Sequence, residues 1–203
     1  MLECETLADA LTTDTQRIAR GLRQRDVALL HELVDQYQFR LVRYLIYLLG
    51  RRDAVVDDLV QETWLRVLEH GRSYNGRSRF EPWLFTIARN LTMDHLRKRR
   101  IVSLDSSSDS SDQPEHRDLP SLVSNAPSPF ELAARTEEAH RIAHTLQSLE
   151  SIYREALVLR FQEELSLQEI SAVIGVPLTT VSSRIYRGLA TLRAQMEGEE
   201  HAD

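Results

Sequence analysis

The sequence predicts an all-α protein made of two small helical domains joined by a flexible linker. Apolar residues recur at helical spacing over most of the chain. No stretch shows the sustained alternation of a strand flanked by hairpin turns. A segment rich in Ser, Asp and Pro separates the two helical parts and cannot bury enough apolar surface to fold by itself. A chain of 203 residues has room for two modest cores.

The N-terminal domain is expected at 26–100, after an N-terminal segment at 1–25 that holds a short helix around 14–22. A long helix should begin after Asp26 as N-cap and end at Gly50, because glycine accepts the left-handed conformation that terminates helices. Its apolar residues recur at helical spacing up to Leu49.

A third helix, capped by Asp53, is expected to reach about His70. Its apolar stripe should be buried and comprises Val56, Leu59, Val60, Trp64, Val67 and Leu68. After a turn at 71–76, a fourth helix should start near Pro82, since proline is favourable in the first helical turn, and continue to the basic cluster at 97–100.

The linker is placed at 101–127, where the chain is acidic and rich in Ser, Asp and Pro. The C-terminal domain follows at 128–196, and a capping box at Ser128 and Glu131 opens its first helix. That helix should run to about Leu149 and a second from Ser151 to Gln162, ahead of two more helices. An acidic tail occupies 197–203.

The most specific motif is LSLQEISAVIGVPLTTVSSRIYRGLATLR at 165–193. Gly175 can end one helix, Pro177 cannot continue it, and Thr179 or Thr180 can cap the next. This is the layout of a DNA-reading helix-turn-helix, whose second helix enters the major groove. The residues placed to contact DNA are Thr179, Thr180, Ser182, Ser183, Arg184 and Arg187. The alternative is a helical hairpin of a buried core, with its arginines in solvent.

A second nucleic-acid surface is expected at 72–100, where aromatic and basic residues alternate. Rings can stack on the bases of a single strand while arginines meet phosphates. Tyr74 and Phe80 are the stacking candidates, because Trp83 and Phe85 follow the helical spacing of a core. Polar groups that could read a base edge or meet the backbone are Asn75, Arg77, Asn90, Asp94, Arg97 and Arg100. The arginines at 97–100 are also explained as charges that complement a helix dipole.

The third helix carries an acidic face made of Asp57, Asp58, Gln61 and Glu62. Acidic side chains do not approach a DNA backbone, but they suit docking onto a basic protein helix. A solvated helix face explains the same pattern.

Composition narrows the function classes. The formal net charge is −6, yet 77–100 carries seven basic residues against Glu81 and Asp94. One cysteine, no membrane-length apolar run and no signal peptide indicate a cytoplasmic protein. His140 and His144 have metal-ligand spacing without a third ligand, and neither a phosphate loop nor a nucleophile with a base partner is evident. No catalytic residue, metal or cofactor is therefore expected.

Two motifs together resemble bacterial RNA polymerase sigma factors. They are DLVQETWLRVLE with FEPWLFTIARNLTMDHLRKRR at 58–69 and 80–100, and the helix-turn-helix at 165–193. Their order and separation are similar to the extracytoplasmic-function type of the sigma-70 superfamily. The resemblance implies that 26–100 is region 2, which binds core polymerase and melts and reads the −10 element, and that 128–196 is region 4, which reads −35.

The resemblance also assigns roles by position. It places −35 contacts to duplex DNA at Thr179, Thr180, Ser182, Ser183, Arg184 and Arg187. It places −10 contacts to the melted non-template strand at Tyr74, Asn75, Arg77, Phe80, Asn90, Asp94, Arg97 and Arg100. It places core-polymerase contacts at Asp57, Asp58, Leu59, Gln61, Glu62 and Trp64.

The partners that the resemblance implies are core RNA polymerase, through the clamp helices of its largest subunit and the flap of the second-largest, and promoter DNA. The resemblance also makes an anti-sigma factor that clamps the two domains a possible partner. It implies no stable insertion into a membrane. The chain departs from the family at Arg25, Thr179 and Ser182, where glycine, glycine and a basic residue are common. A conventional helix-turn-helix regulator that acts without being a polymerase subunit is the alternative.

Overall fold

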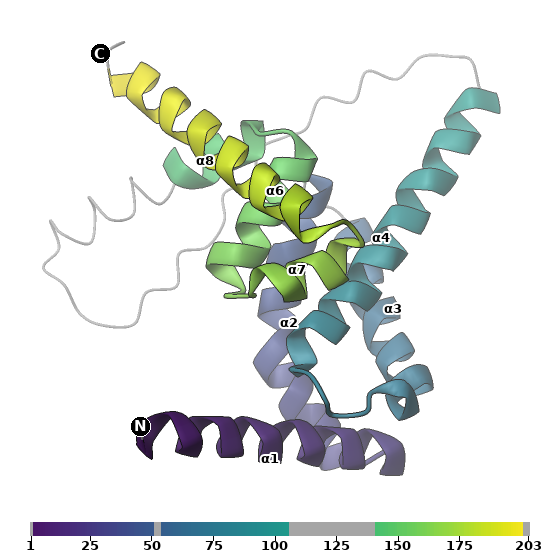
Figure 1. Ribbon diagram of the computed structural model, residues 1–203. Coiled ribbons are helices and arrows are strands. Elements are labelled where there is room, and N and C mark those ends of the chain that lie inside the picture. The colour runs from purple at the N-terminus through teal and green to yellow at the C-terminus, as the bar shows by residue number, and fades with distance from the viewer. Residues whose placement is uncertain (1, 51–53, 106–140, 201–203) are drawn as a thin grey trace, which may run out of the picture.

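The structure is a computed structural model that describes residues 2–50, 54–105 and 141–200 (Figure 1), and every regular element within these ranges is a helix. The all-α prediction is confirmed. None of the helices in these ranges is long and apolar enough to cross a membrane. The expected cap Asp53, the helix start at Ser128 and linker residues 106–127 lie outside the described residues.

The N-terminal unit begins with α1 (Leu2–Gln24), which is much longer than the short helix expected at 14–22. Figure 1 shows α1 lying crosswise at the base of α2 (Val27–Leu49). The side chain of Asp26 accepts hydrogen bonds from the backbone N–H groups of Ala28 and Leu29, as a helix N-cap does. Gly50 ends α2 with φ +71°, so both predicted ends of this helix are confirmed.

Two further helices complete this unit: α3 (Ala54–His70) and α4 (Phe80–Asp105), joined by a short 3-10 turn, η1 (Gly71–Ser73). The fourth helix starts two residues before Pro82, so that this proline lies within its first turn. It also extends past the basic cluster, and the first residues of the expected linker are therefore helical. Leu68 was expected in the buried stripe of α3, but it is 40 % exposed.

The C-terminal unit contains a helical stretch at 141–148, α6 (Ser151–Leu157), α7 (Leu167–Ile174) and α8 (Leu178–Glu200). The helix expected from Ser151 to Gln162 changes at Val158 into a π-helical turn, η2 (Val158–Gln162). A π turn holds one more residue than an α turn and changes the direction in which the following side chains point.

The two units pack directly against each other. One apolar cluster lies inside the N-terminal unit, where α1, α2 and α4 meet. A second cluster is shared: it joins Leu41 and Phe85 of α2 and α4 to Leu159 and Ile170 of η2 and α7. Figure 1 shows α6 and α7 against α2 and α4, with α8 on the outer side. The two helical parts predicted from the sequence thus form one continuous body in the described residues.

Candidate nucleic-acid interface

The helix-turn-helix is built as its sequence predicts. Ser166 and Glu169 form a capping box at the start of α7, with each side chain accepting the other residue's backbone N–H at 3.2 and 2.8 Å. Gly175 ends α7 in the left-handed conformation (φ +74°), and the hydroxyl of Ser171 donates to the carbonyl of Val176 at 2.6 Å. These bonds fix the turn between α7 and α8.

The start of α8 differs from the expected threonine cap. The helix begins at Leu178, and the carbonyl of Pro177 accepts its first backbone bonds, from Thr180 and Val181. Both threonines therefore lie inside the first turn, with Thr179 exposed and Thr180 half-buried. Val181 is fully buried, so the inner face of α8 is fixed by packing and its outer face is free to bind.

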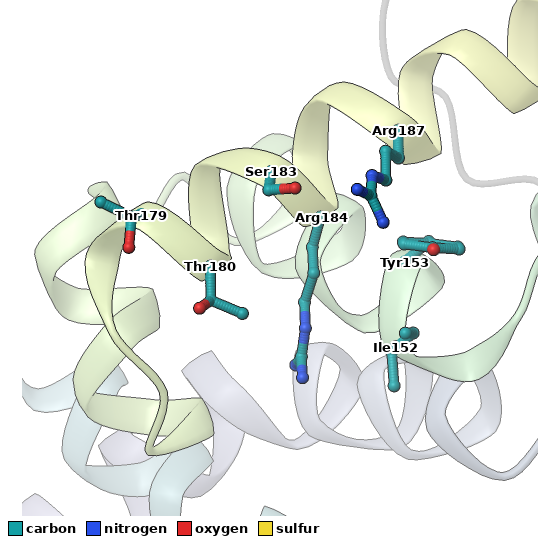
Figure 2. A pocket seen from close by; sticks show the side chains of 7 residues that line it. All are labelled: Ile152, Tyr153, Thr179, Thr180, Ser183, Arg184 and Arg187. Atoms are coloured by element: carbon teal, nitrogen blue, oxygen red, sulfur yellow. The ribbon is translucent and has the colours of Figure 1, made fainter.

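The outer face of α8 surrounds a hollow of about 390 Å³ whose other wall is the start of α6. Figure 2 shows Arg184 and Arg187 extending from α8 on the side where Tyr153 and Ile152 lie. The hollow brings together five of the predicted −35 residues, Thr179, Thr180, Ser183, Arg184 and Arg187. The sixth, Ser182, is outside it and donates its hydroxyl to the carbonyl of Leu178 at 3.1 Å.

The two arginines are available for a ligand. Within the part of the chain that the structure describes, neither Arg184 nor Arg187 has a hydrogen-bond or ion-pair partner. A guanidinium carries five donors in a planar fork that matches the O6 and N7 acceptors of guanine in the major groove. Hydroxyls beside it can bond to bases or phosphates.

The aromatic part of the expected −10 surface is a core, which corrects the sequence expectation. Tyr74 and Phe80 are only 2 % and 1 % exposed, so neither ring can stack on a base in this structure. Phe80 packs edge-on against Tyr37 and Tyr74, with ring centroids 5.3 and 5.5 Å away. Burial raises the pKa of the Tyr74 hydroxyl, which donates to the carbonyl of Ser78 at 2.6 Å. Trp83 is half-buried at the edge of this cluster.

The polar part of that surface is exposed. Asn75 and Arg77 lie on the loop after η1, where the side-chain oxygen of Asn75 accepts the backbone N–H of Arg77 at 2.9 Å. Asn90 is exposed on α4, and one turn further Asp94 pairs with Arg97 at 2.8 Å. The side chain of Arg100 lies outside the described residues.

The segment that follows α3, from Gly71 to Gly76, packs closely against α1. Gly76 has φ +69°, and a β-carbon there would lie 2.8 Å from the carbonyl oxygen of Thr15 in α1. Leu22 of the same helix packs against Gly71. The long N-terminal helix therefore packs against the loop, and Tyr74 lies in the same buried cluster as Ala19 and Leu22 of α1, while Asn75 and Arg77 are exposed. The sequence did not reveal this, because the loop and α1 are far apart along the chain.

The acidic face of α3 is present and contains apolar residues that the sequence analysis missed. Asp57, Asp58 and Gln61 are exposed, and Glu62 pairs with Arg66 at 2.9 Å. Leu65 and Leu68 follow at helical spacing on the same face and are 53 % and 40 % exposed. Leu59 and Trp64 are the other two predicted contacts with core polymerase. Leu59 is buried and Trp64 is half-buried, so both lie on the inner side of α3 rather than on its acidic face. The helical spacing of Leu65 and Leu68 from Asp58 and Gln61 is the sequence signal that places these two leucines on the acidic face.

Among the described residues, no three His, Cys, Asp or Glu side chains lie close enough together to bind one metal ion. His144 is exposed, and His140 lies outside the described ranges.

The comparisons with known proteins agree on one family. Residues 33–101 match sigma-70 region 2, and residues 139–192 match sigma-70 region 4. The chain is 30 % identical over 171 residues to the extracytoplasmic-function (ECF) RNA polymerase sigma factor SigX of Bacillus subtilis, covering 81 % of this chain and 82 % of SigX. It is 29 % identical over 166 residues to SigW of the same organism, covering 81 % and 87 %.

Solved structures show the same fold. CnrH in complex with the cytosolic domain of CnrY superposes with a TM-score of 0.63 at 24 % identity, over 90 % of this chain and 97 % of that chain. The sigma factor RpoE of Bartonella quintana, in complex with the anti-sigma factor NepR, gives a TM-score of 0.65 at 23 % identity, over 82 % and 96 %.

Proposed function

Because the chain belongs to the ECF RNA polymerase sigma factors, we propose that it directs core polymerase to promoters by reading −35 as duplex and −10 as a melted non-template strand. The observation that carries the proposal is the outer face of α8, where Arg184 and Arg187 have no partner within the described residues. In this proposal the protein catalyses no reaction itself; it gives promoter specificity to core RNA polymerase.

The −35 reading assigns base contacts to Arg184 and Arg187 and accessory bonds to Thr179, Thr180 and Ser183. A bidentate arginine–guanine contact contributes about 1–3 kcal/mol of discrimination. Ser182 contributes less, because its hydroxyl already bonds to the backbone of α8.

The −10 reading assigns the strand to the exposed polar groups Asn75, Arg77, Asn90, Asp94, Arg97 and Arg100. Tyr74 and Phe80 act as the scaffold that holds the loop, and not as stacking platforms. Trp83 lies at the edge of the aromatic cluster and is half-buried, so its ring is more exposed than those of Tyr74 and Phe80.

Core polymerase docks on α3. Asp57, Asp58, Gln61 and Glu62 complement the basic clamp helices of the largest subunit, while Leu65 and Leu68 add an apolar contact. A second contact uses an apolar hollow of about 250 Å³ in the C-terminal unit, to which Leu157, Phe161 and Leu189 contribute. We assign it to the flap of the second-largest subunit. The complex of RpoE with the anti-sigma factor NepR extends the proposal to an anti-sigma partner for this chain.

Run-off transcription tests the proposal. Bacterial core polymerase and a promoter library are combined with the wild-type protein, with Arg184→Ala/Arg187→Ala, or with Arg193→Ala, a matched control further along α8. We expect initiation at a defined set of sites with the wild type and the control. The double variant should initiate less from these sites, and its remaining initiation should show a relaxed −35 preference. Tight duplex binding without polymerase, and no added initiation, would support a conventional regulator instead.

A further inference from the structure

The hollow in front of α8 has a second wall, which the helix-turn-helix motif does not supply. Ile152 and Tyr153, in the first turn of α6, line it together with the −35 candidates of α8. Figure 2 shows the guanidinium of Arg187 directed toward the ring of Tyr153. Both residues of α6 precede the motif at 165–193 in the sequence. The site is therefore formed by two helices and not by the recognition helix alone.

The crossing of α6 and α8 fixes the place of this ring. A β-carbon at Gly188 of α8 would lie 3.3 Å from the β-carbon of Tyr153 and 3.1 Å from Cδ1 of Leu157. The two helices therefore touch at this glycine, which directly follows Arg187 in the sequence. The backbone N–H of Tyr153 also bonds to the carbonyl of Glu150 at 3.0 Å. The ring is thus attached to a well-held part of the backbone beside the arginine.

The packing of the core does not account for Tyr153. This residue is half-buried and belongs to neither of the two apolar clusters. Its hydroxyl has no hydrogen-bond partner in the part of the chain that the structure describes. A ring that borders a hollow without filling a core is placed to act on the side chains that share the hollow.

An exposed arginine reads a base well only when its direction is restricted. The guanidinium fork has to meet the O6 and N7 acceptors of guanine with both donors at once, and hydrogen bonds weaken steeply when they lose alignment. Arg187 is exposed and has no partner among the described residues, so its long side chain has many rotamers. The ring of Tyr153 borders the hollow on the side of α6 and excludes the rotamers that point there. An arginine restricted in this way loses less freedom when it binds.

We propose that Tyr153 is a positioning residue for Arg187 and, through it, a determinant of the −35 sequence preference. The ring restricts the arginine to directions in which both donors reach the edge of one base pair, and Gly188 lets α6 come close enough for this. The inference rests on the proposed reading of −35 by α8. Because the ring and not the hydroxyl has this role, phenylalanine should replace Tyr153, whereas a side chain without a ring should not.

The test measures the −35 preference base by base. Holoenzyme with the wild type, Tyr153→Ala, Tyr153→Phe, Arg187→Ala or Tyr153→Ala/Arg187→Ala transcribes a promoter library with a randomised −35 element, and the transcripts are sequenced. The same proteins without polymerase select duplexes from that library. Phe39→Ala is the matched control, because it removes a 47 % exposed ring of α2 that lies outside the hollow. Circular dichroism verifies folding, and Tyr153→Leu, which keeps an apolar side chain against Gly188 but has no ring, decides the result if Tyr153→Ala is not folded.

We expect Arg187→Ala to relax the preference at one position of the element. Tyr153→Ala should reduce the preference at the same position by about three- to tenfold, since it restores only part of the rotamer freedom of the arginine. The double variant should be no less selective than Arg187→Ala, because the ring acts only through the arginine. Tyr153→Phe and the control should keep the wild-type preference. A merely structural role would lower total initiation by Tyr153→Ala and leave its preference unchanged.

Three results would overturn the proposal: an unchanged preference in Tyr153→Ala or its leucine substitute, a loss at a position that Arg187→Ala does not affect, and a phenylalanine variant as relaxed as the alanine variant. A wild type that selects duplexes alone but adds no initiation with core polymerase would reject the proposed function, and the selection would then decide the role of Tyr153. A wild type with no sequence preference in either assay would overturn both.

Discussion

Replacing Phe80 with alanine separates the two roles that this ring could have. If the ring is a stacking platform, its removal should weaken DNA melting and leave folding intact. If it is the centre of the aromatic cluster, its removal should destabilise the N-terminal unit. The ring is 1 % exposed and contacts Tyr37, Tyr74 and Trp83 at centroid distances of 5.3, 5.5 and 5.6 Å.

The structure supports a large effect on stability. A buried Phe→Ala change costs about 3–5 kcal/mol. Its two edge-on pairs, with Tyr37 and Tyr74, place this site toward the upper end, since each such pair adds about 0.5–1.5 kcal/mol beyond area burial. Such a loss is a large part of the roughly 5–15 kcal/mol that holds a typical domain folded.

Urea unfolding followed by circular dichroism measures the effect. Phe39→Ala is the matched control, because Phe39 is 47 % exposed on α2, where the guanidinium carbon of Arg43 lies 5.8 Å from the centroid of its ring. The control should lose no more than about 1 kcal/mol. An unchanged unfolding midpoint for Phe80→Ala, together with a defect in promoter melting, would refute the scaffold role and restore the stacking interpretation.

Three further predictions concern local geometry and pH. Gly76→Ala should destabilise the protein by more than Gly175→Ala in the same urea assay. Both glycines have left-handed backbones, which cost a residue with a β-carbon about 1–2 kcal/mol, but only at Gly76 would the new β-carbon also meet an atom, the Thr15 carbonyl oxygen at 2.8 Å. Equal losses of stability in the two variants would contradict this. The hydrogen bonds from Arg17 hold the pKa of Glu32 below its ordinary value of 4.5. The wild type should therefore be more stable than Glu32→Gln above that pH, and the difference should disappear as acid titrates the carboxyl; an advantage confined to acid would have the wrong sign. Burial raises the pKa of Tyr44 and Tyr74 above the ordinary 10.0, so stability should fall as pH rises above 10, and an ultraviolet titration should show these two hydroxyls ionising only with unfolding.

Local signals in the sequence predicted the local structure well. Asp26 and Gly50 marked the two ends of α2, and Gly175 marked the end of α7, because a cap or a left-handed turn is decided by a few neighbouring residues. The helix-turn-helix face could be predicted for the same reason. The spacing of Thr179, Ser183 and Arg187 on one helix fixes their common orientation whatever the rest of the chain does.

Long-range packing was beyond the reach of the sequence. Tyr74 was expected to stack on a base because it lies in the glycine-containing segment before the fourth helix, but it is buried against Phe80, Trp83 and the apolar side chains of α1. Glu163, which is buried and pairs with Arg40 and Arg43, is the stronger case. It is 123 residues from Arg40 and 120 from Arg43, and its neighbours in the sequence are the polar residues Gln162 and Glu164. Nothing local distinguishes a buried carboxylate from a solvated one.

The buried charges also bear on how an acidic chain can bind DNA. In the packed arrangement, Arg40 and Arg43 share the carboxylate of Glu163 and Arg89 pairs with Glu155, so part of the positive charge of α2 and α4 is already paired within the chain. Any separation of the two units would return these arginines to solvent on α2 and α4. Pairing of these arginines within the chain lowers the positive potential that would attract DNA of any sequence, which is consistent with the formal net charge of −6.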